Sequence, residues 1–182
     1  MGEMAEQRRC GFIAVIGAPN AGKSTLVNAL VGAKVAIVSR KVQTTRAALR
    51  GIAVEGDSQL VFIDTPGIFR PRRRLDRAMV DAAWSGAGDA DIILLVVDAA
   101  KGIDEELDRI LERLADTRLP RLLALNKIDR VKKDQLLELA SELNKRVAFG
   151  NTFMISALEG DGTGDLKTYL AGNVPLGPWH YP

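Results

Sequence analysis

The stretch GAPNAGKST, residues 17–25, says most about how this 182-residue chain folds, and it comes directly after the apolar run FIAVI. Its spacing, G-x-x-x-x-G-K-S, is that of a phosphate-binding loop, in which backbone N–H groups at a helix N-terminus surround an anion. Gly17 and Gly22 permit the tight turn, and the backbone from Pro19 to Thr25 would line the phosphate groups. The stretch therefore predicts a strand, a phosphate-binding turn and a helix in direct succession.

Two side chains of this loop carry its chemistry. Lys23 would reach the β- and γ-phosphates of a nucleotide, and the Ser24 hydroxyl would ligate Mg²⁺. The competing interpretation is a glycine-rich turn that binds nothing, and the loop alone does not select a base. The nucleotide ligands predicted from the loop are Gly17, Ala18, Pro19, Asn20, Ala21, Gly22, Lys23, Ser24 and Thr25.

Apolar runs alternate with helical periodicities along the chain, which is typical of an α/β sheet. Several runs are continuous, as expected for strands covered on both faces. The predicted fold class is α/β: a P-loop NTPase with a small-GTPase-like three-layer α/β/α sandwich and a mostly parallel six-stranded sheet. The predicted strands are Phe12–Ile16, Ala47–Val54, Gln59–Ile63, Ile92–Val97, Arg121–Leu125 and Thr152–Ile155. The predicted helices are Lys23–Val31, a segment that begins at Asp104 and includes Leu107 to Leu114, a segment from Leu136 to Val147, and Asp165–Ala171.

The composition fits one domain with its own core, because the chain is 47% apolar and 26% charged with a net charge of +2. The basic run RPRRRLDR, residues 70–77, favours a solvated loop face over a nucleic-acid contact. A single cysteine, Cys10, excludes an internal disulfide and fits a reducing compartment. The longest aliphatic run, residues 92–97, is far shorter than the roughly 20 residues that span a bilayer. We expect a cytoplasmic protein without a transmembrane segment.

A second candidate element is VFIDTPG, residues 61–67. A strand that ends at Asp64 would place a carboxylate beside the phosphate-binding loop, where it can hold Mg²⁺ through water. Thr65 and Pro66 follow in the same loop, and Gly67 would offer its backbone N–H to the γ-phosphate. Taken alone, the motif is also compatible with an ordinary turn.

The third element, LALNKID at residues 123–129, matches N-K-x-D. Asp129 can accept two hydrogens from guanine, from N1–H and the 2-amino group, and adenine offers neither. Lys127 would lie along the base and Asn126 would tie loops together; the alternative is a polar turn that ends in a helix cap. The fourth element, Ser156-Ala157-Leu158, would present a backbone N–H to the O6 atom of guanine. Four elements in this order, each after a strand, predict a guanine-nucleotide-binding domain.

These motifs resemble the GTPase domain of the Era family of bacterial ribosome-assembly GTPases. The resemblance rests on GAPNAGKST, SRKVQTTRAALRGI, FIDTPGI, NKID and ISAL, and runs from about residue 10 to residue 175. It implies a tail at 1–10, an Era-type GTPase domain at 11–172 and a linker at 173–182. It also implies GTP hydrolysis to GDP and phosphate in 16S rRNA processing and 30S subunit assembly. Family members carry a KH-type RNA-binding domain after the linker, which would make the rRNA contact and which we expect to be missing from this chain. Peripheral association with the inner membrane is part of the same resemblance.

The resemblance also bears on catalysis. Ras-like GTPases place a glutamine directly after D-x-x-G, but this chain has Ile68, which cannot orient water. Related GTPases use a bound K⁺ ligated by an asparagine of the phosphate-binding loop, and Asn20 holds that position; the alternative is that Asn20 only satisfies loop backbone groups. Thr45, with Thr44 as the second choice, would complete the Mg²⁺ coordination. The predicted catalytic set is Lys23, Thr45 and Gly67, the predicted Mg²⁺ ligands are Ser24, Thr45 and Asp64, and the predicted K⁺ ligand is Asn20.

Three rival functions remain open at the level of the sequence. The GTPase domain of a tRNA-modifying or another ribosome-assembly GTPase shares G-x-P-N-x-G-K-S and D-T-P-G. A scaffold that binds nucleotide without hydrolysis is compatible with Ile68. An ATP-using P-loop kinase is disfavoured by Asp129. The loop SRKVQTTR, residues 39–46, favours the Era family, because generic small GTPases do not share it.

Overall fold

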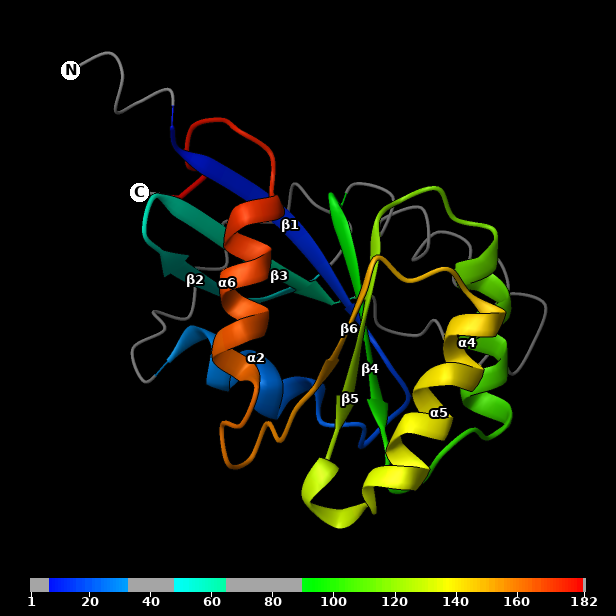
Figure 1. Ribbon diagram of the computed structural model, residues 1–182. Coiled ribbons are helices and arrows are strands. Elements are labelled where there is room, and N and C mark those ends of the chain that lie inside the picture. The colour runs from blue at the N-terminus through cyan, green and yellow to red at the C-terminus, as the bar shows by residue number, and fades with distance from the viewer. Residues whose placement is uncertain (1–6, 33–47, 65–89, 182) are drawn as a thin grey trace.

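The computed structural model describes residues 7–32, 48–64 and 90–181, which form a six-stranded sheet between two layers of helices (Figure 1). The strand order is β2-β3-β1-β4-β5-β6. Strand β2 runs antiparallel to β3, and the other neighbours are parallel. This is the three-layer α/β/α sandwich that the sequence predicts. The elements are β1 (Arg9–Ile16), α2 (Lys23–Val31), β2 (Ala48–Glu55), β3 (Ser58–Asp64), β4 (Ile92–Asp98), α4 (Glu105–Ala115), β5 (Arg121–Asn126), η1 (Ile128–Arg130), α5 (Lys133–Arg146), β6 (Asn151–Met154) and α6 (Thr163–Asn173).

Both faces of the sheet are buried, which explains the continuous apolar runs in its central strands. In β4, Ile93, Leu95 and Val97 face the core that α4 and α5 cover. The alternate residues of the same strand face the core that α2 and α6 cover. Because successive side chains of a strand point to opposite faces, a strand between two helical layers needs apolar residues at every position. Figure 1 shows the two helix pairs on opposite sides of the sheet.

The six predicted strands are present, and none of their ends differs from the predicted end by more than three residues. The helix predicted as Lys23–Val31 has those bounds, and Gly32 follows it with a φ of 81°. The last helix, predicted as Asp165–Ala171, extends to Thr163–Asn173. The side chain of Asp104 caps α4 by accepting a hydrogen bond from Leu107 N at 2.9 Å.

The parallel strands bring the predicted motifs to one edge of the sheet. Strand β1 is central, and residues 17–22 connect its carboxyl end to α2. Strand β3 ends at Asp64, strand β5 ends at Asn126, and the Ser156 segment follows β6. Ligands of open α/β sheets bind outside the carboxyl ends of the strands, so the topology alone places the candidate site here.

The C-terminal segment, expected as a linker at 173–182, packs against the domain over residues 174–181. Val174 is fully buried. The N–H of Cys10 donates to Pro175 O at 3.1 Å, and the N–H of Gly177 donates to Arg8 O at 2.8 Å. This part of the segment therefore closes the amino-terminal end of β1, a role that its content of proline and glycine does not reveal.

Gln59 anchors the end of this segment. It lies on β3, is only 2% exposed, and its Oε1 accepts hydrogen bonds from the N–H groups of His180 and Tyr181, both at 3.0 Å. Its Nε2 donates to Tyr181 O at 2.9 Å. A buried amide is satisfied here by backbone groups of the C-terminal segment, so Gln59 and the segment stabilise each other.

We predict that Gln59→Leu lowers the free energy of unfolding by about 2 kcal/mol, because three hydrogen bonds are lost and the backbone groups of the segment lose their partner. Urea unfolding followed by circular dichroism measures the change. Gln135→Leu, at an exposed position of α5, is the matched control and should change stability by less than about 0.5 kcal/mol. Equal losses in the two variants would contradict the anchoring role.

Candidate functional site

The loop at residues 17–22 is shaped by two glycines that admit no side chain. A Cβ on Gly17 would lie 2.6 Å from Val96 O, which belongs to the neighbouring strand β4. Gly22 has a φ of 104°, and a Cβ there would lie 2.1 Å from Asn126 Nδ2. The two glycines of the motif are therefore required by close backbone packing and by a left-handed conformation. The sequence predicted the turn, but it did not predict that Val96 and Asn126 lie against the two glycines.

Helix α2 begins directly after this loop and offers an anion site. Its first turn consists of Lys23, Ser24 and Thr25, and its N-cap Gly22 has no side chain that could cap their N–H groups. The Lys23 ammonium donates to Gly17 O at 2.7 Å, so it lies across the mouth of the loop. Burial lowers the pKa of Lys23, Asp64 opposes this effect, and Arg50 adds to it. Charge and backbone donors thus converge where the sequence places the phosphates.

Asn126 joins the two sides of the site, as predicted. Its Nδ2 donates to Ala21 O at 2.9 Å, and its Oδ1 accepts from Ala157 N at 2.9 Å. Asn126 is 3% exposed, so both hydrogen bonds are excluded from solvent. Asn126 therefore fixes the phosphate-binding loop against the Ser156 segment, and this structural part of its predicted role is confirmed.

Lys127 is held by Asp98, a partner that the N-K-x-D motif does not reveal. It has a φ of 66°, and its ammonium donates to Asp98 Oδ2 at 2.8 Å and to Asn20 O at 3.0 Å. Burial acts to raise the pKa of Asp98, but the bond from Lys127 and the N–H groups of residues 100 and 101 lower it below the usual range. Asp98 ends β4, which pairs with β1, the strand that leads into the phosphate-binding loop. The position of Asp98 directly after an apolar run, in VVDAAKG, could have identified it as a site residue from the sequence.

Two adjoining cavities lie over these residues. One, of about 150 Å³, is lined by Asn126, Lys127, Asp129, Arg130, Ser156 and Leu158 together with Gly22 and Thr25. The other, of about 410 Å³, is lined by Asn20, Gly22, Lys23, Ser24, Thr25 and Lys127. Because the two share three lining residues, a single ligand can occupy both. The first is lined by five of the six residues predicted at the guanine base, without Ala157. The second is lined by five of the nine ligands predicted in the phosphate-binding loop, without Gly17, Ala18, Pro19 and Ala21. Arg130 was not anticipated from the sequence.

The Ser156 segment already uses two of its N–H groups. Ser156 N donates to Asp161 O at 2.9 Å, and Ala157 N donates to Asn126 Oδ1. The side chain of Leu158 is 79% exposed at the rim of the smaller cavity. A contact of Ser156 or Ala157 N–H with the O6 atom of guanine would therefore have to share or replace an existing bond. That contact stays a prediction.

Ser24 and Asp64, the two predicted Mg²⁺ ligands within the described residues, lie within reach of one guanidinium group. Arg50 Nη1 donates to Ser24 Oγ at 3.0 Å, and Arg50 Nη2 forms an ion pair with Asp64 Oδ2 at 2.9 Å. A hydroxyl and a carboxylate are oxygen donors of the kind that Mg²⁺ binds. The residues present therefore fit the metal ion. The position of Arg50 between them does not follow from the sequence motifs.

Several predicted residues lie outside the described part of the chain. These are Thr44 and Thr45 in the segment after α2, and Thr65, Pro66, Gly67 and Ile68 after β3. Their assigned roles with Mg²⁺, the γ-phosphate and water stay predictions. The basic run at 70–77 lies outside it as well.

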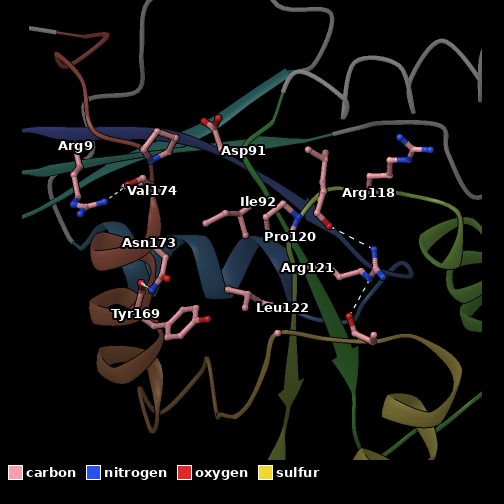
Figure 2. Close-up of a pocket in the computed structure, with 14 residues that line it drawn as sticks. Arg9, Asp91, Ile92, Arg118, Pro120, Arg121, Leu122, Tyr169, Asn173 and Val174 are labelled. Carbon is pink, nitrogen blue, oxygen red and sulfur yellow. Dashed lines mark hydrogen bonds between the residues drawn. The ribbon is translucent and has the colours of Figure 1, made fainter.

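A cavity of about 600 Å³ lies at the opposite edge of the sheet, where β1, β4 and β5 begin (Figure 2). Arg9 Nη1 donates to Val174 O at 2.7 Å, and Arg121 Nη1 donates to Thr117 O at 2.6 Å. The first bond connects the start of β1 to the end of α6, and the second connects the start of β5 to the loop that follows α4. Figure 2 shows the Arg118 side chain directed away from Arg9. Size alone thus does not identify the candidate site, because the predicted nucleotide ligands gather at the other edge.

Within residues 7–32, 48–64 and 90–181, none of the helices combines the length and the apolar character needed to cross a bilayer.

Comparison with known proteins agrees with this geometry. The profile of the family described as 50S ribosome-binding GTPase matches residues 12–127. GTPase Era of Mesorhizobium japonicum is 63% identical over 172 residues, which cover 94% of this chain and 56% of the relative. GTPase Era of Afipia carboxidovorans is 59% identical over 180 residues, which cover 99% of this chain and 58% of the relative. The chain thus spans less than two thirds of the length of these relatives.

Solved structures of Era proteins are also similar to this chain. The crystal structure of a single-residue variant of Aquifex aeolicus Era bound to GDP·AlF4⁻ superposes with a TM-score of 0.77 at 34% identity, over 96% of this chain and 60% of that one. Era in complex with MgGDPNP and nucleotides 1506–1542 of 16S ribosomal RNA superposes with a TM-score of 0.78, also at 34% identity and the same coverage.

We predict that Asn126→Ala lowers the free energy of unfolding by about 2 kcal/mol, because it leaves the carbonyl of Ala21 and the N–H of Ala157 without a partner in a buried place. Thermal unfolding of the nucleotide-free protein measures this loss. Asn173→Ala, which removes an exposed side chain at the end of α6, should have a small effect. A loss at Asn126 that does not exceed the loss at Asn173 would contradict the bridging role.

Proposed function

Because this chain belongs to the family of 50S ribosome-binding GTPases, and within it to the Era GTPases, we propose that it binds GTP with Mg²⁺ and hydrolyses it to GDP and phosphate. The single observation that carries the proposal is the pair of adjoining cavities at the carboxyl ends of the strands. One has the residue types that recognise guanine, and the other has those that bind phosphate.

In this proposal Lys23 leaves the carbonyl of Gly17 and turns to the β- and γ-phosphates, and the N–H groups at the start of α2 surround the same anion. Ser24 and Asp64 hold Mg²⁺, which neutralises phosphate charge when it is bound. Asp129 accepts the two guanine N–H groups. Thr45 at the metal and Gly67 at the γ-phosphate complete the set, and the segments that contain them would respond to loss of the γ-phosphate.

We propose further that the whole protein acts in 16S rRNA processing and 30S subunit assembly. The support is the identity of 59–63% to Era GTPases and a solved Era complex that contains 16S ribosomal RNA. The chain spans 56–58% of its relatives, so a KH-type domain as the rRNA-binding part belongs to the same proposal. The proposed compartment is the cytoplasm. Contact with the inner membrane rests on the resemblance alone.

Single-turnover hydrolysis tests the enzymatic part. With protein in excess over GTP and with Mg²⁺ present, we expect slow release of phosphate, on the order of 10⁻³ s⁻¹ or below, as in GTPases that act without a partner. Lys23→Ala should abolish it, and Lys145→Ala on the exposed face of α5 should not change it. Binding of GTP without any release of phosphate above the Lys23→Ala background would support the nucleotide-dependent scaffold instead.

The identity of the base is tested at Asp129. We predict that Asp129→Asn weakens GDP binding at least about 100-fold and improves binding of xanthosine diphosphate, because an amide reverses one of the two hydrogen-bond polarities. Competition against a fluorescent guanine nucleotide measures both affinities. Asp116→Asn, beyond the end of α4, is the matched control. Unchanged GDP affinity in Asp129→Asn would contradict the assignment of Asp129 to the base.

The monovalent ion is tested at Asn20, whose φ of 67° is a conformation that asparagine tolerates better than most residues. If the Asn20 side chain ligates K⁺, hydrolysis should be faster in K⁺ than in Na⁺ at equal ionic strength. Asn20→Gly keeps the backbone conformation and removes the amide oxygen, so it should remove the stimulation; Asn20→Asp keeps an oxygen and should retain part of it. Equal rates in K⁺ and Na⁺ for the unsubstituted protein would show that Asn20 serves only the loop conformation.

A further inference from the structure

Arg50 occupies an unusual place in β2. The pairing of β2 with β3 shifts between Leu49 and Gly51, so Arg50 is the extra residue of a β-bulge. Bulges free one residue from regular pairing and change the direction of its side chain. The next residue, Gly51, packs so closely on α2 that a Cβ there would lie 3.1 Å from Val31. The bulge and this close packing together fix the strand against α2.

The Arg50 side chain reaches both predicted Mg²⁺ ligands at once. One terminal nitrogen donates to Ser24 Oγ at 3.0 Å, and the other pairs with Asp64 Oδ2 at 2.9 Å. The side chains of Arg50 and Asp64 are only 18% and 23% exposed. The third donor, Nε, is buried and makes no hydrogen bond with any residue that the structure describes. The guanidinium is therefore positioned by the two oxygens that a divalent cation would use.

We propose that Arg50 is an internal cation that competes with Mg²⁺ for Ser24 and Asp64, and so sets the Mg²⁺ concentration at which nucleotide binds. This inference rests on the proposed function, because it assumes that a Mg²⁺–nucleotide complex enters the cavity beside α2. The guanidinium and Mg²⁺ cannot both contact the same hydroxyl and carboxylate, since two cations at that separation repel each other. Entry of the metal therefore requires Arg50 to leave.

The competition has a physical rationale in the free protein. Without nucleotide, Asp64 would be a half-buried carboxylate near the phosphate site, where its charge would repel an incoming anion. Arg50 compensates that charge and keeps Ser24 and Asp64 close together. When the metal arrives, the ion pair is lost, and this loss reduces the apparent affinity for Mg²⁺. Arg50 thus stabilises the empty site relative to the metal-bound one.

A different role predicts the opposite result. If Arg50 contacted the phosphates of the bound nucleotide, its removal would weaken nucleotide binding and raise the Mg²⁺ requirement, because a favourable charge would be lost. The direction of change in the Mg²⁺ requirement therefore distinguishes an arginine that competes with the metal from an arginine that assists it.

The test is a titration of free Mg²⁺, set with an EDTA buffer, against the fluorescence of N-methylanthraniloyl-GDP. We expect Arg50→Gln to lower the half-saturating Mg²⁺ concentration about fivefold, which corresponds to one partly exposed ion pair. Arg50→Met, which keeps the aliphatic stem of the side chain, should give the same shift and guards against a folding defect specific to Gln. Arg146→Gln removes the same charge from the Arg146–Asp108 ion pair between α5 and α4 and should leave the value unchanged.

A second readout needs no nucleotide. In EDTA, Arg50→Gln should lower the midpoint of thermal unfolding, because Asp64 loses its partner, and saturating Mg²⁺–GDP should narrow the gap to the unsubstituted protein. An unchanged or raised Mg²⁺ requirement in both Arg50 variants would overturn the inference and leave the proposed function intact. Failure of the unsubstituted protein to bind the fluorescent nucleotide at any Mg²⁺ concentration would overturn both.

Discussion

The hydrogen bonds of Asn126 hold the candidate site in one piece. Three loops that follow different strands meet there. Asn126, at the end of β5, belongs to one of them, and its side chain bonds the other two through Ala21 O and Ala157 N. The bonds are possible only because Gly22 has no side chain: a Cβ at that position would overlap with the Asn126 amide. Gly22 and Asn126, which lie far apart in the sequence, thus define how the two adjoining cavities lie relative to each other.

The sheet explains why such distant residues can meet. Strands β1, β3, β4, β5 and β6 are parallel, so their carboxyl ends lie at one edge. Helices cover both faces, and this leaves the edge as the place where polar side chains reach solvent. Asp98 and Lys127 show the consequence: the ends of β4 and β5 place a carboxylate and an ammonium 2.8 Å apart, and the Lys127 ammonium also binds the carbonyl of Asn20.

Much of this arrangement follows from the sequence, because it depends on local patterns. Continuous apolar runs such as residues 92–97 mark strands buried on both faces, and the spacing of Gly17, Gly22 and Lys23 marks the phosphate-binding turn. The contacts that depend on tertiary geometry do not follow. Arg50 meets Ser24 and Asp64 through a bulge with no sequence signature, and Gln59 anchors a segment whose prolines and glycines suggested a linker. Asp98 was accessible in principle, since it comes directly after a predicted strand next to the loop.

The most direct test of guanine-nucleotide binding is a calorimetric titration of the nucleotide-free protein with GDP and with ADP in the presence of Mg²⁺. We expect one GDP site per chain and at least about 1,000-fold weaker binding of ADP, because adenine lacks the two donors that Asp129 would accept. Equal affinities for GDP and ADP, or no binding of GDP, would contradict the assignment of the two adjoining cavities to a guanine nucleotide.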